Sequence, residues 1–210
     1  MKKITDNIFL FKYFLEFEDF KGYTNIFVVV GNKFIFVLDT SSNPIEMQTV
    51  KEFILQKYTS HKIVVFNSHS DFDHFGGNNA FEKEIIIATN QCKINIANQQ
   101  VKKIALPNVS FEKRLSFPNE QVIFFASQGH TKDSASCYFK KHKFLFCGDN
   151  VENPHPYYKN ELLKEHIKTL ESYKKYDFNI IAFGHGNVEY GSKLLNKNIN
   201  YLKGKMNETG

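Results

Sequence analysis

The segment from Asn67 to Gly77 is the part of this chain most able to do chemistry, because histidines and aspartates are concentrated in it. Within six positions it holds two imidazoles and two carboxylates, on His69, Asp71, Asp73 and His74. Imidazole nitrogen and carboxylate oxygen are ligands that zinc, iron and manganese accept. A hydrophobic core has no use for these groups at such density, so the segment is interpreted as metal-binding.

Short apolar runs precede this segment and three further candidate ligands. The apolar residues 63–66 predict a buried strand that ends where the polar cluster begins. Downstream, three similar runs are each followed by a polar residue beside a glycine, namely His130, Asp149 and His185. A rigid strand aims such groups, and the loop after it leaves their tips accessible. Each strand end is therefore expected to deliver one potential ligand.

In order and spacing these residues resemble the motifs of the metallo-β-lactamase superfamily of metallohydrolases, over most of the chain. The first motif of that superfamily is H-x-H-x-D-H, and this chain has His69-x-Asp71-x-Asp73-His74. The departure is Asp71, which stands where the family usually has its second histidine. The strand that ends at Asp39 also resembles the position of the family's buried acidic residue.

The resemblance implies two divalent metal ions, with zinc as the first expectation and iron or manganese as alternatives. One ion would be held by His69, Asp71 and His130, the other by Asp73, His74 and His185, and Asp149 would bridge both. A metal-bound hydroxide would attack a small ester, thioester, lactone, amide or phosphoester. Asp73 is also expected to act as a catalytic carboxylate, which orients the nucleophile and passes a proton to the leaving group.

Asp71 changes the expected charge of the donor set. Three carboxylates and a hydroxide balance two divalent ions, so the formal charge is zero, whereas a histidine at this position would leave it positive. A neutral set favours harder metals, and it weakens the attraction for anionic substrates.

Three functional classes stay open at this point. A metal-dependent hydrolase is the first expectation. The flavodiiron branch of the superfamily also has a carboxylate, a glutamate, at the position of Asp71 and reduces oxygen or nitric oxide, but this chain lacks that branch's fused flavin-binding domain. A noncatalytic metal-binding member is the third class.

The composition indicates which classes of binding partner to expect. The net charge is +5, but Arg114 is the only arginine, and the lysines are scattered along the 210 residues. Arginine forks are the usual means of gripping bases and phosphates, so no nucleic-acid partner is expected. Cys92, Cys137 and Cys147 share no metal-binding spacing, and no signal peptide or membrane span is apparent. We expect a cytoplasmic protein with a small-molecule substrate and no membrane partner; its oligomeric state is open.

The pattern of elements predicts an α/β fold, and the resemblance selects the αβ/βα four-layer sandwich of two mixed sheets, as one domain over residues 1–210. Strands at 24–30 and 33–39 form a hairpin at Gly31-Asn32, and a helix begins at Asn43-Pro44. Another helix is expected at about 160–176, and a last one from Ser192 to Lys203, ended by Gly204.

Some residues outside the metal-binding motifs can be interpreted in two ways, and others are expected to have only a structural role. The segment Leu15–Tyr23 is either an apolar flap over the site or aromatic packing at a sheet edge. His155 either binds substrate or, as the first expectation, lies on a surface loop. His61, His142 and His166 are taken as surface or helix-end residues.

Overall fold

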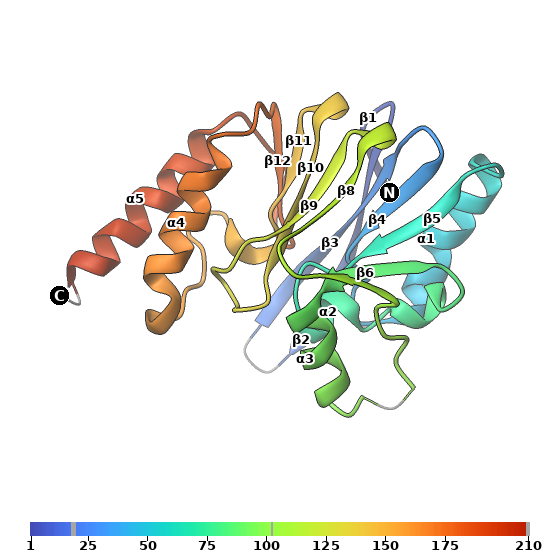
Figure 1. The fold of residues 1–210 in the computed structure, drawn as a ribbon, viewed down its shortest axis with the longest axis horizontal. Helices are drawn as coiled ribbons and strands as arrows, with labels where there is room; N and C mark the ends of the chain where they lie inside the picture. Colours follow the sequence, from blue (N-terminus) through green and yellow to red (C-terminus); the bar gives the residue numbers. More distant parts are fainter. Residues whose placement is uncertain (18–19, 102, 209–210) are drawn as a thin grey trace. The chain divides into compact units, whose positions relative to one another are not determined.

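The computed structural model describes residues 1–17, 20–101 and 103–208 of the chain. The chain splits into two compact units, Met1–Glu112 and Lys113–Gly210. Each unit is built on one mixed β-sheet with helices (Figure 1). The expectation of a single domain over residues 1–210 stays a prediction.

The sheet of the first unit has seven strands in the described residues, in the order of the chain from β1 to β7. Strands β1 to β4 pair antiparallel, and β4 to β7 pair parallel. The elements are β1 (Lys2–Thr5), β2 (Ile8–Phe17), β3 (Phe20–Val30), β4 (Phe34–Leu38), α1 (Pro44–Lys57), β5 (Lys62–Phe66), α2 (Phe72–Phe75), the 3₁₀ helix η1 (Asn78–Phe81), β6 (Ile85–Thr89), α3 (Asn90–Asn98) and β7 (Val109–Phe111).

The local signals in the first half of the chain are confirmed. Strands β3 and β4 form the expected hairpin, in which Val30 lies opposite Ile35. Helix α1 begins after Asn43, whose side-chain oxygen accepts a hydrogen bond from the backbone nitrogen of Ile45 at 2.9 Å. The apolar face of α1 is buried in a cluster that also contains residues of β2 to β5.

The parallel pairing of β4 and β5 brings two strand ends together. Leu38 lies opposite Phe66, the last residue of β5. The backbone nitrogen of Asp39 donates to the oxygen of Phe66 at 2.8 Å. Because both strands end at the same edge of the sheet, the polar residues that follow them emerge side by side.

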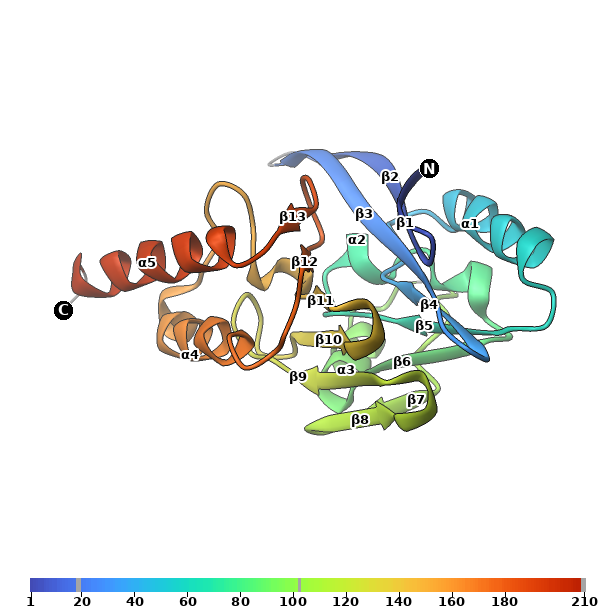
Figure 2. The same ribbon diagram turned by 90° about the horizontal axis from the view of Figure 1, so that it is seen from above.

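The sheet of the second unit has six strands in the described residues, in the order β13-β12-β11-β10-β9-β8. Strand β8 lies at its edge (Figure 2). The elements are β8 (Arg114–Phe117), the 3₁₀ helix η2 (Pro118–Glu120), β9 (Val122–Ala126), β10 (Ala135–Phe139), η3 (Lys140–His142), β11 (Phe144–Phe146), η4 (Gly148–Asn150), η5 (Asn160–Leu162), α4 (Leu163–Tyr173), β12 (Ile180–Ala182), β13 (Glu189–Tyr190) and α5 (Lys193–Glu208).

Helices α4 and α5 lie side by side in this unit, and their apolar faces share one core with the sheet (Figures 1 and 2). The expected end of the last helix at Gly204 is wrong, because α5 continues to Glu208. A glycine inside a helix costs only about 1 kcal/mol relative to alanine. Beyond Gly204, Lys205 pairs with Glu208 at 2.8 Å and lies over the Tyr201 ring, contacts that form only when the helix continues.

Among the described residues, no helix combines the length and the apolar character that crossing a membrane would require.

Candidate metal centre

A buried polar network holds the loop after β5 in place. The side-chain nitrogen of Asn67 donates to the backbone oxygen of His74 at 3.0 Å, and Asn67 and Asn78 exchange side-chain hydrogen bonds. A methyl group on Gly77 would collide with the backbone oxygen of Thr40, so only glycine allows the loop to approach so closely. These contacts therefore fix the backbone that carries the candidate metal-ligating side chains.

Asp39 is the centre of this arrangement, as its resemblance to the family's buried acidic residue suggested. It is fully buried and has a φ of 61°, in the left-handed region. Its carboxylate accepts hydrogen bonds from the backbone nitrogen of Ser68 at 2.7 Å, from the Ser68 hydroxyl at 2.8 Å and from Nδ1 of His74 at 2.7 Å. Three donors thus stabilise a buried negative charge.

These bonds determine which nitrogen of each histidine carries the proton. An ionised carboxylate only accepts, so His74 must donate to Asp39 from Nδ1–H. Because the Ser68 hydroxyl gives its single proton to Asp39, it accepts from Nδ1 of His69, at 3.0 Å. Both rings are therefore protonated on Nδ1 and present a lone pair on Nε2, the form in which imidazole binds a metal.

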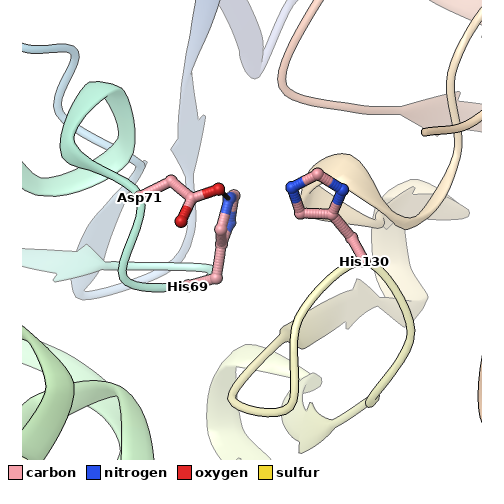
Figure 3. A group of neighbouring side chains, drawn as sticks. All are labelled: His69, Asp71 and His130. Atoms are coloured by element: carbon pink, nitrogen blue, oxygen red, sulfur yellow. Dashed lines mark ion pairs between the residues drawn. The ribbon is translucent and has the colours of Figure 1, made fainter. Parts of the chain in front are cut away.

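Each of these Nε2 atoms lies next to a carboxylate of the same loop. The distance from His69 Nε2 to an oxygen of Asp71 is 3.3 Å, and that from His74 Nε2 to an oxygen of Asp73 is also 3.3 Å. Figure 3 shows the carboxylate of Asp71 beside the ring of His69. Both histidines are buried, whereas the Asp71 side chain is 50% exposed.

A bound cation would explain why the Nε2 lone pairs of the two histidines face two carboxylates. Without a proton or a metal ion between them, such acceptor atoms repel each other. Protonation of both rings would place two positive charges in rings whose centroids are only 4.0 Å apart. Two ligand atoms bound to one tetrahedral ion at about 2.1 Å lie roughly 3.4 Å apart, close to the observed spacing. The donor set of the first unit therefore fits a metal ion.

The second unit repeats this pairing at the ends of two parallel strands. Phe146 of β11 lies opposite Ala182 of β12, so Asp149 and His185 follow neighbouring strand ends. Nε2 of His185 lies 3.2 Å from a carboxylate oxygen of Asp149. Asp149 is almost fully buried, and the His185 side chain is 18% exposed. The distance is again that between two ligands of one ion.

His130 lies in the same unit, on the loop between β9 and β10 (Figure 3). Its backbone nitrogen donates to the side-chain oxygen of Asn150 at 2.8 Å, which ties this loop to the residue after Asp149. The edge of the Tyr157 ring faces the His130 ring, with centroids 5.8 Å apart. Tyr157 is largely exposed.

Glu152 is a residue that the sequence reasoning missed. Burial, followed by the negative charge of Asp149, raises its pKa to about 7, against the lowering effects of the Tyr157 backbone and of His130 and His185. Its carboxylate accepts a hydrogen bond from the backbone nitrogen of Tyr157 at 3.1 Å. No motif marks Glu152; its position three residues after Asp149 is the only signal in the sequence.

His166 corrects an expectation, because it is fully buried rather than on the surface or at a helix end. Its Nε2 lies 2.8 Å from the backbone oxygen of Asn150 and donates to it, since that oxygen can only accept. A methyl group on Gly129 would meet the His166 ring and the Asn150 side chain. His166 and Asn150 thus support the two loops that carry His130 and Asp149.

This histidine should make stability depend on pH. Burial, with a smaller effect of His130, lowers the pKa of His166 from 6.5 to about 4, although its bond to Asn150 opposes the shift. As pH falls, the unfolded chain protonates at His166 before the folded protein does. The neutral form of buried His166 therefore makes its full contribution to the free energy of unfolding above pH 6.5, and this contribution is lost as pH falls towards 4. At pH 5 the loss is at most about 2 kcal/mol.

Urea unfolding at pH 7 and pH 5 measures this loss. The variant His166→Gln keeps a donor towards Asn150 but cannot titrate, so its free energy of unfolding should change less over the same interval. An equal pH dependence in the two proteins would contradict the assignment and place the titration on another group.

The other expectations around the site have mixed outcomes. His155 is exposed, as expected, and stacks on Tyr201 with ring centroids 4.2 Å apart. In the segment Leu15–Tyr23, Leu15 is buried, and the half-exposed Tyr23 packs edge-on against Phe14. Residues 18 and 19, and the side chains of residues 17 and 20, lie outside the described residues. The choice between a flap and edge packing stays open.

Comparisons with known proteins agree with the resemblance of the motifs. Residues 20–89 match the family model described as the metallo-beta-lactamase superfamily. The chain is 26% identical over 208 residues to metallo-beta-lactamase IND-1 of Chryseobacterium indologenes, an alignment that covers 92% of this chain and 87% of that protein. By these matches the chain is similar to proteins of the metallo-β-lactamase superfamily. The resemblance of its motifs is thereby confirmed.

A second relative bears a different name. The chain is 28% identical over 120 residues to a hydroxyacylglutathione hydrolase of a Synechococcus species, which covers 54% of this chain and 45% of that protein. This chain thus aligns with less than half of that relative. These similarities, together with the candidate imidazole and carboxylate ligands, support a metal-dependent hydrolase.

Solved structures confirm the fold. A metallo-beta-lactamase from Pontibacter korlensis has a TM-score of 0.81 at 18% identity, covering 96% of this chain and 97% of that one. The structure of TMB-1 has a TM-score of 0.84 at 20% identity, with 98% and 97% coverage. The αβ/βα sandwich of two mixed sheets expected for this superfamily is therefore correct.

Proposed function

We propose that this protein is a hydrolase with a dinuclear metal centre. The ligands are His69, Asp71, Asp73, His74, His130, Asp149 and His185. The observation that carries the proposal is the contact of Nδ1 of His69 with Ser68 and of Nδ1 of His74 with Asp39, which leaves both Nε2 atoms facing carboxylates. A cation between these Nε2 atoms and carboxylates would remove their mutual repulsion.

Bound metal ions would supply an activated water, with a pKa lowered towards about 7, and would polarise the oxygen of the scissile bond. The residues of the chain supply position and proton transfer. Asp39 keeps the proton of His74 on Nδ1 and so keeps Nε2 available. Asp73 is mostly buried but retains contact with solvent, which suits a carboxylate that takes a proton and returns it to a leaving group.

Charge indicates which substrates the centre favours. Asp71 adds a carboxylate where the family usually has an imidazole, and Glu152 is a further acidic residue whose pKa responds to Asp149, His130 and His185. A site with this many carboxylates attracts anions weakly. We therefore propose a small neutral ester, thioester, lactone or amide as the substrate class, ahead of phosphoesters.

Metal analysis together with a substrate panel tests the proposal. Protein purified without added metal, and then loaded with zinc, manganese or iron, is assayed on chromogenic esters, thioesters, lactones and phosphodiesters. We expect about two ions per chain and turnover that a chelator abolishes. Visible absorption with consumption of oxygen or nitric oxide would favour the di-iron alternative. Absence of both stoichiometric metal and turnover would leave a noncatalytic member.

Asp71 should influence which metal is preferred. In the variant Asp71→His the donor set loses one negative charge and gains a softer ligand, so competition between zinc and manganese should shift towards zinc, by about tenfold. Equilibrium dialysis against both metals measures the ratio. The variant Asp6→His makes the same change at an exposed aspartate and should leave the ratio unaltered. An identical ratio in Asp71→His and the unaltered protein would exclude Asp71 as a ligand.

A further inference from the structure

A second candidate ligand site lies in the unit Lys113–Gly210, at the edge of its sheet formed by β8 (Figure 2). It is an open cavity of about 430 Å³. The cations Arg114 and Lys140 line it together with the polar side chains of Ser116 and Gln121. We propose that this cavity binds a small organic molecule that carries one carboxylate or phosphate group on an apolar body.

Backbone hydrogen bonds fix the walls of this cavity. Ser116 of β8 lies opposite Ile123 of β9 in an antiparallel pair. The backbone nitrogen of Gln121 donates to the oxygen of Pro118 at 3.1 Å, and that of Lys140 donates to the oxygen of Gln121 at 2.9 Å. Because strand pairing and two tight turns position these residues, the cavity is formed before any ligand arrives.

The two cations in the lining are available to a ligand. Among the residues that the structure describes, neither Arg114 nor Lys140 forms a side-chain hydrogen bond or an ion pair. Three other lysines of the same unit do form ion pairs, namely Lys143 with Asp177 and both Lys174 and Lys203 with Glu171. Two cations without acidic partners on one concave surface favour an anion.

The chemistry of the lining specifies the ligand further. The guanidinium of Arg114 can donate two parallel hydrogen bonds to a carboxylate or a phosphate. The Ser116 hydroxyl and the Gln121 amide can add further bonds to its oxygens. Pro118, Val122 and Ile123 supply apolar surface for the rest of the molecule. The volume suits a small molecule, since ligand cavities usually measure about 300–1,000 Å³.

Titration of ¹⁵N-labelled full-length protein with phenyl phosphate and with benzoate tests this assignment, with benzyl alcohol as the neutral analogue. We expect saturable shifts of the amide signals of Ser116 and Gln121, with a Kd on the order of 1 mM or tighter for at least one anion. Arg114→Gln and Lys140→Gln should weaken this binding, by about tenfold for Arg114. Both residues are exposed, so these variants should keep the fold.

The control is Lys168→Gln, which removes an exposed lysine of α4 and should leave the affinity unchanged. The proposal is overturned if no saturable shift occurs at Ser116 and Gln121, if benzyl alcohol binds as tightly as the anions, or if Lys168→Gln weakens binding as much as Arg114→Gln. Shifts confined to residues 69–74 would also overturn it, because they would place the anion at the proposed metal centre.

Discussion

Replacement of Asp149 by asparagine should lower kcat/KM by about a thousandfold, equivalent to about 4 kcal/mol of transition-state stabilisation. A carboxylate can offer one oxygen to each of two ions, whereas an amide offers a single neutral oxygen. The change also removes one negative charge from the donor set, so the metal content should fall from two ions to about one. The side chains have nearly the same size, and the fold should be retained.

Kinetics on the best substrate of the panel, metal analysis and circular dichroism measure these three quantities. The matched control is Asp177→Asn, the same change at an exposed carboxylate of this unit that pairs with Lys143 at 2.8 Å. It should keep full activity and full metal content. A folded Asp149→Asn protein with unaltered turnover would refute the assignment of Asp149 as a bridging ligand.

Replacement of Asp39 by asparagine should weaken metal binding by about 10- to 100-fold, although Asp39 is not itself a ligand. Asparagine places an amide NH₂ group where one carboxylate oxygen of Asp39 accepts hydrogen bonds. Two donors then face each other, because this group meets either Ser68 or Nδ1–H of His74. The His74 ring loses the partner that fixes its tautomer. Leaving a buried donor unsatisfied should also cost about 3 kcal/mol of unfolding free energy.

Two comparisons separate these effects. Asparagine tolerates the positive φ of Asp39, so Asp39→Ala should be less stable than Asp39→Asn by the additional cost of the left-handed backbone, about 1 kcal/mol. Ser68→Ala removes one of the three hydrogen bonds to Asp39 and should have a smaller effect on both metal affinity and stability. Metal titration and urea unfolding measure the two quantities. Wild-type metal affinity in Asp39→Asn would show that Asp39 has only a structural role.

Local signals in the sequence were sufficient where a few neighbouring residues determine the outcome. The turn at Gly31-Asn32 and the cap at Asn43 depend on short-range geometry, and both are confirmed. Short strands such as β7, β8 and β13 were not predicted, because two to four residues show no hydrophobic period. Each of them is an edge strand, stabilised by pairing with the strand next to it in the chain: β7 with β6, β8 with β9 and β13 with β12.

In the candidate site, too, some features follow from the sequence and others only from the tertiary structure. The sequence by itself determined which side chains could bind metal, because donor type and order along the chain are properties of the residues, and it marked Asp71 as the departure. Only the tertiary structure decided that Asp39 and Ser68 set the protons of His69 and His74 on Nδ1. The same holds for the burial of His166 and the raised pKa of Glu152. Hydrogen bonding and desolvation depend on which segments surround a group in space, and the linear order of residues does not contain that information.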